Sequence, residues 1–172
     1  MIPIVLLLPV LLLAPIVAAL AQRPVESGAY QLMLKTLLAH SVPEASVAEI
    51  TEEQGEVTYL DARERREYEV SHIPGAIWVG YDDFDLSRVR DVAKDARLVV
   101  YCSVGYRSEK VTEQLLANGW RNVRNLYGGI FEWKNQGHAV VTPAGEETER
   151  VHAYNRTWGI WLRSGEKVYG EP

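Results

Sequence analysis

The sequence predicts an α/β fold in which a mainly parallel central sheet is flanked by helices. Two observations lead to this prediction. Between residues 57 and 137, segments with the composition of strands alternate with segments that have the apolar spacing of helices. In addition, LVVYC at 98–102 is continuously apolar, as expected of a strand buried on both faces. The chain of 172 residues is long enough for one ordinary domain.

The expected elements follow one another along the chain. Strands are predicted at 57–60, 76–79, 98–102 and 123–126. Helices are predicted at 30–40, 64–70, 107–119 and 128–137. Two further helices are predicted from local capping signals. A short one begins after Ser46, which forms a capping box with Glu49, and one runs from Asp82 or Asp83 to about Val92.

The first 21 residues carry no charge and are excluded from the fold prediction. They end in Ala19-Leu20-Ala21, a small-x-small pattern of the kind cut by signal peptidase. We therefore expect an export signal and an extracytoplasmic, for example periplasmic, protein. The alternative is an uncleaved membrane anchor, because about 20 apolar residues span a bilayer.

The remainder divides into three segments by composition. Residues 22–40 are expected to be a helical lead-in, residues 41–141 the main domain, and residues 142–172 a C-terminal extension. The polar stretch that opens the extension, TPAGEETER at 142–150, is expected to be a linker. Trp158, Trp161 and Tyr169 are expected to pack against the domain, with an exposed patch for a partner as the alternative.

Charge and composition exclude several classes of function. The net charge of −5 gives no indication of nucleic-acid binding. A single cysteine forms no internal disulfide and no CxxC pair. The four histidines are scattered without metal-ligand spacing, so no metal site is predicted.

That single cysteine, Cys102, ends the buried strand expected at 98–102, and Arg107 begins the helix that follows. Ligand sites in open parallel sheets lie at this edge of the sheet. A loop of four residues lies between them: Ser103, Val104, Gly105 and Tyr106. If the loop curls around the sulfur, its backbone N–H groups form an anion-binding nest at a helix N-terminus.

Two residues of this stretch strengthen that interpretation. Gly105 permits a positive φ, and Arg107 adds a fixed positive charge. Both effects favour the thiolate of Cys102 over the thiol, so the stretch predicts a nucleophilic sulfur. The alternative is an inert cysteine buried at the end of a strand.

Three stretches together resemble the rhodanese (sulfurtransferase) homology domain: YLDARERREYEVSHIPGAIWV at 59–79, VVYCSVGYRS at 99–108 and NLYGGIFEWKNQGHAVV at 125–141. The resemblance covers about 41–141 and departs from the family at Ser71, where glycine is frequent. It implies a doubly wound α/β domain with a central parallel sheet. It also implies that Cys102 carries a persulfide during turnover, with no metal or organic cofactor.

Loop length separates the relatives within this resemblance. Four residues separate Cys102 from Arg107, as in the sulfurtransferases, whereas phosphatase and arsenate-reductase relatives have one more. A tighter ring of N–H donors suits a single terminal sulfur and crowds a phosphate. The expected activity is transfer of a sulfane sulfur from a donor such as thiosulfate, or from a protein persulfide. The acceptor is a thiol, cyanide, sulfite or a protein.

The resemblance also suggests roles for residues around the loop. Asp61 and Arg63 match an acid–base pair of the family, and we expect an ion pair that braces the loops. His72 is expected to order the turn before the next strand rather than to act as a general base. Ser108 is expected to cap the helix, with ordering of the loop as the alternative.

Two other functions remain open at this point. One is a non-enzymatic persulfide carrier or docking module, in which the aromatic extension binds a partner. The other, disfavoured by loop length, is a phosphatase-like or arsenate-reducing enzyme. The physiological donor and acceptor and the oligomeric state do not follow from the sequence.

Overall fold

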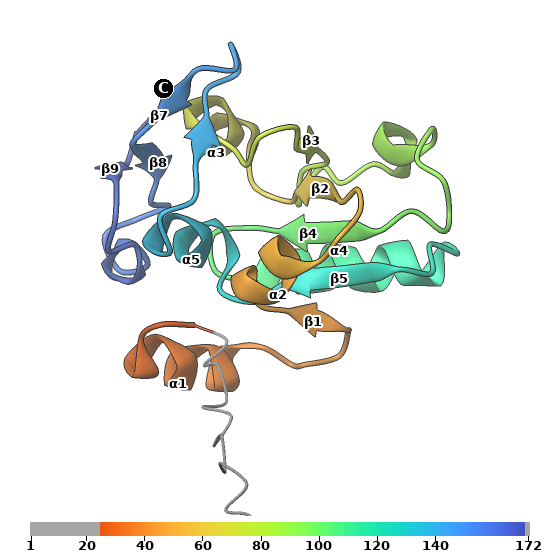
Figure 1. Ribbon diagram of the computed structural model, residues 1–172, viewed down its shortest axis with the longest axis horizontal. Helices are drawn as coiled ribbons and strands as arrows, with labels where there is room; N and C mark the ends of the chain where they lie inside the picture. The colour runs from red at the N-terminus through yellow and green to blue at the C-terminus, as the bar shows by residue number, and fades with distance from the viewer. Residues whose placement is uncertain (1–24, 171–172) are drawn as a thin grey trace, which may run out of the picture.

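A computed structural model describes residues 25–170 of the chain. The predicted export signal at 1–21 lies outside the described residues. Five parallel strands form the central sheet, in the order β1-β5-β4-β2-β3 (Figure 1). They are β1 (Glu44–Ala45), β2 (Thr58–Asp61), β3 (Ile77–Trp78), β4 (Leu98–Tyr101) and β5 (Val123–Leu126). The predicted α/β architecture is confirmed, and β1 is a short edge strand that the composition did not indicate.

Helices connect and cover the strands. They are α1 (Gly28–Leu37), α2 (Val47–Glu52), α3 (Arg65–Val70), α4 (Tyr106–Ala117) and α5 (Gly129–Asn135). The predicted capping box at α2 is present, with reciprocal hydrogen bonds between Ser46 and Glu49. Among the described residues, no helix has the length and apolar character needed to cross a bilayer.

Side chains of β4 alternate between the two cores that the sheet separates. Leu98 and Val100 pack with residues of α4, whereas Val99 and Tyr101 pack in the core that contains α1, α2 and α5. Figure 1 shows α2 and α5 on the near side of the sheet. All four residues of β4 are fully buried, which explains the continuous apolar run.

Both ends of the described chain pack on the α5 side of the sheet. Tyr30 and Leu34 of α1 belong to the same core cluster as Leu162 near the C-terminus. The Tyr30 ring stacks on Trp161 with ring centroids 5.2 Å apart. Glu109 of α4 secures the chain after α1, because it accepts hydrogen bonds of 3.1 Å from the backbone N–H groups of residues 39 and 41.

The C-terminal extension forms ordered structure beside α3 and α5 (Figure 1). Its elements are β8 (Arg150–His152), the 3-10 helix η2 (Gly159–Trp161) and β9 (Glu166–Val168), and β8 pairs in parallel with β9. Trp158 and Trp161 are partly buried against the core, as predicted, whereas Tyr169 is exposed.

Two sequence predictions differ from the structure. The predicted linker at 142–150 contains the turn and the second strand of a hairpin, in which β6 (Val140–Val141) pairs with β7 (Glu147–Thr148). Gly145 closes its turn at φ +82° by donating its N–H to Thr142 O. The predicted helix over 82–92 is reduced to the 3-10 helix η1 (Leu86–Val89). Aspartates favour local turn hydrogen bonds over helix continuation, and here Asp85 accepts from the Ser87 N–H.

Candidate active site

Cys102 directly follows β4, the middle strand of the sheet, and faces the start of α4. The backbone N–H of Gly105 donates to Cys102 Sγ over 3.1 Å. Gly105 is the N-cap of α4 and has φ +125°, a value that L side chains rarely adopt. The loop therefore curls back over the sulfur, which is the condition under which its amides form an anion-binding nest.

Other amides of the same loop remain available for hydrogen bonding. Within residues 25–170, five N–H groups of the loop and of the start of α4 have no hydrogen-bond acceptor: those of Ser103, Val104, Tyr106, Arg107 and Ser108. The last three belong to the first turn of α4, where helix geometry leaves N–H groups without intrahelical partners. Such a series of donors at a helix N-terminus favours an anionic group beside the sulfur.

Arg107 is held by a buried carboxylate that the sequence analysis did not single out. Its guanidinium donates to both oxygens of Glu67, over 2.6 and 2.9 Å, and to Ser103 Oγ over 3.0 Å. Ser103 Oγ also donates to Glu67 over 3.1 Å. Burial lowers the pKa of Arg107, but the hydrogen bonds and charge of Glu67 outweigh it and raise that pKa overall. Arg107 is thus tied to the loop through Ser103, and Glu67 largely balances the positive charge that the sequence analysis assigned to it.

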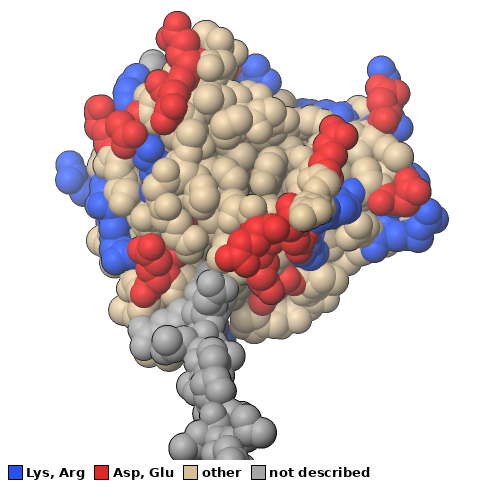
Figure 2. Space-filling view, viewed as in Figure 1, with Lys and Arg blue, Asp and Glu red and all other residues tan. Residues whose placement is uncertain are grey.

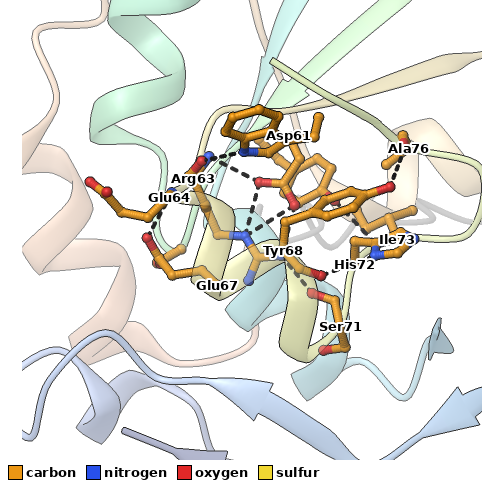
Figure 3. Close-up of polar contacts among 12 residues, drawn as sticks. Asp61, Arg63, Glu64, Glu67, Tyr68, Ser71, His72, Ile73 and Ala76 are labelled. Atoms are coloured by element: carbon orange, nitrogen blue, oxygen red, sulfur yellow. Dashed lines mark hydrogen bonds and ion pairs between the residues drawn. The ribbon is translucent and has the colours of Figure 1, made fainter. Parts of the chain in front are cut away.

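Asp61 and Arg63 form the expected ion pair at the same edge of the sheet (Figure 3). Both are fully buried, and Arg63 Nη2 lies 2.7 Å from Asp61 Oδ2. The same nitrogen donates to Ser71 O over 2.7 Å, which ties the end of β2 to the end of α3. In the described part of the chain, no hydrogen bond or ion pair joins these two residues to Cys102, which is consistent with the bracing role predicted for them.

His72 orders the turn before β3 through its backbone and its ring. Its N–H and C=O pair with Val141, and its ring stacks on Tyr68 with centroids 3.9 Å apart (Figure 3 shows both rings). Burial lowers the pKa of His72, although a hydrogen bond with Tyr68 O acts in the opposite direction. His72 does not line the pocket beside the cysteine.

Ser108 orders the cysteine loop rather than capping α4. The N-cap is Gly105, which has no side chain, and Ser108 Oγ lies 3.1 Å from Gly105 O and 2.7 Å from Asn125 Oδ1. Asn125 of β5 also donates from Nδ2 to Gly105 O over 3.0 Å. These bonds orient the peptide group before α4.

A pocket of about 320 Å³ borders the cysteine loop. The loop contributes Cys102, Ser103, Val104, Tyr106 and Arg107, and other segments contribute Leu37, Glu64, Tyr81, Asp82, Tyr154 and Trp158. Cys102 is only 1% exposed, so the sulfur is reached through this pocket. Among the described residues, no cluster of histidine, cysteine and acidic side chains has the arrangement of a metal site.

A comparison with protein families decides the relationship of this chain. The family model described as the rhodanese-like domain matches residues 45–136, just over half of the chain. The chain belongs to the rhodanese-like family. The predicted family and fold are thereby confirmed, and Cys102 is the single cysteine of this rhodanese-like chain.

Several curated proteins similar to this rhodanese-like chain are named tRNA uridine(34) hydroxylase. The one from Pectobacterium carotovorum subsp. carotovorum is 34% identical over 51% of the chain and 26% of its own length. The one from Hamiltonella defensa subsp. Acyrthosiphon pisum is 31% identical over 87% of the chain and 38% of its own length. The chain therefore spans about a quarter to two fifths of these relatives.

Solved structures show the same fold. The rhodanese-like domain of a protein from Anabaena sp. is 25% identical, with a TM-score of 0.50 over 55% of the chain and 72% of the domain's own chain. The thiosulfate sulfurtransferase from Pseudomonas aeruginosa is 23% identical, with a TM-score of 0.56 over 77% of the chain and 26% of its own. The latter likeness concerns the fold alone.

Parts of the rhodanese-like pocket were not predictable from local sequence. Leu37, Tyr154 and Trp158 border it from outside the family-matched residues. Glu67 binds Arg107 from 40 positions away in the chain. Asn125 binds Gly105 from 20 positions away. The only signal for Glu67 was its place on a short charged helix directly after the Asp61–Arg63 pair.

Proposed function

We propose that this rhodanese-like chain is a sulfurtransferase that carries a sulfane sulfur on Cys102. The observation that carries the proposal is the Gly105 N–H directed at Cys102 Sγ over 3.1 Å, inside a loop with further free donors. Such donors stabilise negative charge that develops on a sulfur atom. Four residues between Cys102 and Arg107 give a ring suited to one sulfur.

The proposed half-reactions balance without an external oxidant or reductant. The Cys102 thiolate attacks the outer sulfur of thiosulfate, a new S–S bond forms, and the electron pair of the broken bond leaves with sulfite. Cys102 then holds a persulfide whose terminal charge faces the amides of the loop. An acceptor removes that sulfur and regenerates the thiolate. Two half-reactions on one residue give ping-pong kinetics.

The test combines intact mass with turnover. After incubation with excess thiosulfate at about 0.5 M salt, where charges at the pocket are screened, and removal of excess donor, we expect the chain to gain the mass of one sulfur, and cyanide to release thiocyanate repeatedly. A gain in mass without turnover supports the persulfide-carrier alternative. Absence of any gain, together with hydrolysis of an aryl phosphate, supports a phosphatase-like enzyme.

The matched control keeps the fold and removes the nucleophile. Cys102→Ser replaces sulfur by oxygen in nearly the same volume, so the variant is expected to stay folded and to lose both loading and turnover. Loading that persists in Cys102→Ser contradicts the assignment of the site.

A second candidate is a part in hydroxylation of tRNA uridine, because the curated relatives carry that name. The net charge of −5 argues against a surface for tRNA. On the face shown in Figure 2, basic side chains of the described residues stand beside acidic ones and form no continuous basic patch. Fluorescence anisotropy with labelled tRNA at low salt tests this candidate, and micromolar binding favours it.

Location in the cell separates the two candidates further. We propose that residues 1–21 direct export, which places the domain away from tRNA. N-terminal sequencing of the chain purified from its source is expected to begin at Gln22. An intact N-terminus together with recovery from the cytoplasmic fraction contradicts export.

A further inference from the structure

We infer that the pocket selects a neutral or cationic thiol as the sulfur acceptor, and that Glu64 and Asp82 reject anionic ones. This inference rests on the proposed sulfurtransferase activity. It concerns the charge of the acceptor, which the cysteine loop by itself does not determine.

The ionised side chains around the pocket do not favour an anion. Glu64 and Asp82 line it, and Arg107 is the only basic side chain among its described lining residues. Arg107 is paired through two hydrogen bonds with Glu67. The charge of Arg107 is therefore balanced within the protein, and two carboxylates remain in excess at the pocket.

Each of these carboxylates is accessible to a bound ligand. The Glu64 side chain is 38% exposed and forms only a long ion pair with Arg107, at 4.0 Å, which leaves its carboxylate open to a ligand. Asp82 is exposed, and within the described residues its carboxylate makes no hydrogen bond or ion pair. A cationic group entering the pocket gains two acceptors, whereas an anionic group meets two like charges.

Apart from Ser103 and Cys102, the rest of the described lining is apolar or aromatic and supplies no second cation. Leu37 contributes from α1, and Tyr154 and Trp158 contribute from the C-terminal extension. Arg107 lies over the Tyr154 ring, 5.1 Å from its centroid, which further occupies the guanidinium. Aromatic faces attract cations and apolar groups, and they offer nothing to a carboxylate or sulfonate.

With Arg107 paired to Glu67, the donors in the described part of the pocket that remain for an anion are the backbone amides around Cys102. The persulfide sulfur occupies that position, while the remainder of an acceptor lies in the acidic part of the pocket. In the transfer step an acceptor thiol bonds to the outer sulfur and the bond to Cys102 breaks. Its electron pair stays on Cys102 as thiolate, and the acceptor's proton passes to the transferred sulfur.

The experiment measures discharge of the preloaded persulfide by three small thiols of different charge. The protein is loaded with excess thiosulfate at about 0.5 M salt, where charges at the pocket are screened, and is then desalted. Cysteamine, 2-mercaptoethanol and 3-mercaptopropionate are cationic, neutral and anionic acceptors. We expect the second-order rate constant to fall in that order at low salt.

The rate constant for cysteamine is divided by the rate constant for 3-mercaptopropionate, and this ratio is compared between each variant and wild type. Intrinsic thiol reactivity cancels in that comparison. In Glu64→Gln/Asp82→Asn we expect the ratio to fall by about five- to tenfold. The matched control, Glu56→Gln/Asp91→Asn, removes two exposed carboxylates that do not line the pocket. It is expected to leave the ratio unchanged.

The outcomes separate this inference from the proposed function. If thiosulfate does not load Cys102 under any salt condition, the sulfurtransferase proposal fails and the inference fails with it. If loading occurs but Glu64→Gln/Asp82→Asn has the same ratio as wild type, only the charge selection is overturned. An equal fall of the ratio in the Glu56→Gln/Asp91→Asn control also overturns it, because net charge then explains the effect.

Discussion

The Glu67 carboxylate and the Arg107 guanidinium form a bidentate ion pair, over 2.6 and 2.9 Å, that joins α3 to the first turn of α4. Burial on its own raises the pKa of Glu67. The hydrogen bond and positive charge of Arg107 outweigh that effect and bring the pKa to about 2. Glu67 is therefore ionised at neutral pH and holds the cysteine loop through Arg107 and Ser103.

Replacing Glu67 by glutamine is expected to cost about 3–5 kcal/mol in the free energy of unfolding, because Arg107 keeps a largely buried charge without its partner. Urea denaturation at pH 7 measures the change. Persulfide loading is expected to slow as well, since Arg107 and Ser103 lose their common anchor.

Glu69→Gln provides the matched control on the same helix. Glu69 pairs with Arg65 at the exposed surface, so its loss is expected to change the free energy of unfolding by no more than about 0.5 kcal/mol. Equal effects of Glu67→Gln and Glu69→Gln would contradict the structural role given to the buried pair.

Gly129 is the position where a side chain is least compatible with the site. A Cβ there would lie 2.4 Å from Cys102 O and 2.6 Å from Ser103 O, and φ is +56°. Gly129→Ala is therefore expected to displace the cysteine loop, to cost more than about 2 kcal/mol and to abolish persulfide formation. Thermal unfolding and intact mass after thiosulfate treatment measure the two effects.

Gly137→Ala separates backbone strain from the close approach at Gly129. Gly137 has φ +82°, but its Cβ would meet nothing within 4 Å. We expect a cost of about 1 kcal/mol and normal persulfide loading. A Gly129→Ala variant that behaves like Gly137→Ala is incompatible with the tight contact at Cys102.

Truncating Leu162 tests whether the C-terminal extension belongs to the core. Leu162 is fully buried in the cluster that includes residues of α1 and α5, so Leu162→Ala is expected to cost about 2–5 kcal/mol. Ile160, two residues earlier, is 61% exposed, and Ile160→Ala is expected to change stability by no more than about 0.5 kcal/mol. Chemical denaturation monitored by tryptophan fluorescence compares the two variants. Similar values would mean that the extension is not integral to the fold.

His152 gives the folding stability a dependence on pH. Burial lowers the pKa of His152 from 6.5, and its Nδ1 accepts the Tyr154 N–H over 3.1 Å. The unfolded chain then binds more protons between the lowered pKa and 6.5, so His152 contributes stability above pH 6.5 that is lost as the pH falls. His152→Asn is expected to reduce the slope of stability against pH below 6.5 by up to about 1.4 kcal/mol per pH unit.

His40 provides a control of opposite sign. Its hydrogen bond with Glu44 raises the pKa of His40 above 6.5, so its contribution is present below pH 6.5 and is lost as the pH rises through the raised value. Asparagine tolerates the positive φ of +53° at this position. His40→Asn is thus expected to make the slope of stability against pH more positive above pH 6.5, which urea titrations from about pH 6 to 8 measure. A change of the same sign in both variants would refute the assignment.

The agreement between sequence and structure is greatest where interactions are local. Ser46 and Glu49 are three residues apart, so their capping box follows from a short peptide motif. The curl of the Cys102 loop likewise depends on neighbours, above all on Gly105. The predicted helix after Asp82 failed because side-chain hydrogen bonds of aspartates compete with helix formation, and propensity alone does not resolve that competition.

The sequence by itself determined the alternation of strands and helices, the family and the place of the single cysteine, because each is encoded in spacing along the chain. Only the tertiary structure decided that Glu67 balances Arg107, that Asn125 orients the loop, and that Tyr154 borders the pocket. These relationships join residues that lie 20 to 47 positions apart in the chain, through packing of separate elements. Their distances and burial, which set the electrostatic balance of the site, are properties of the folded chain.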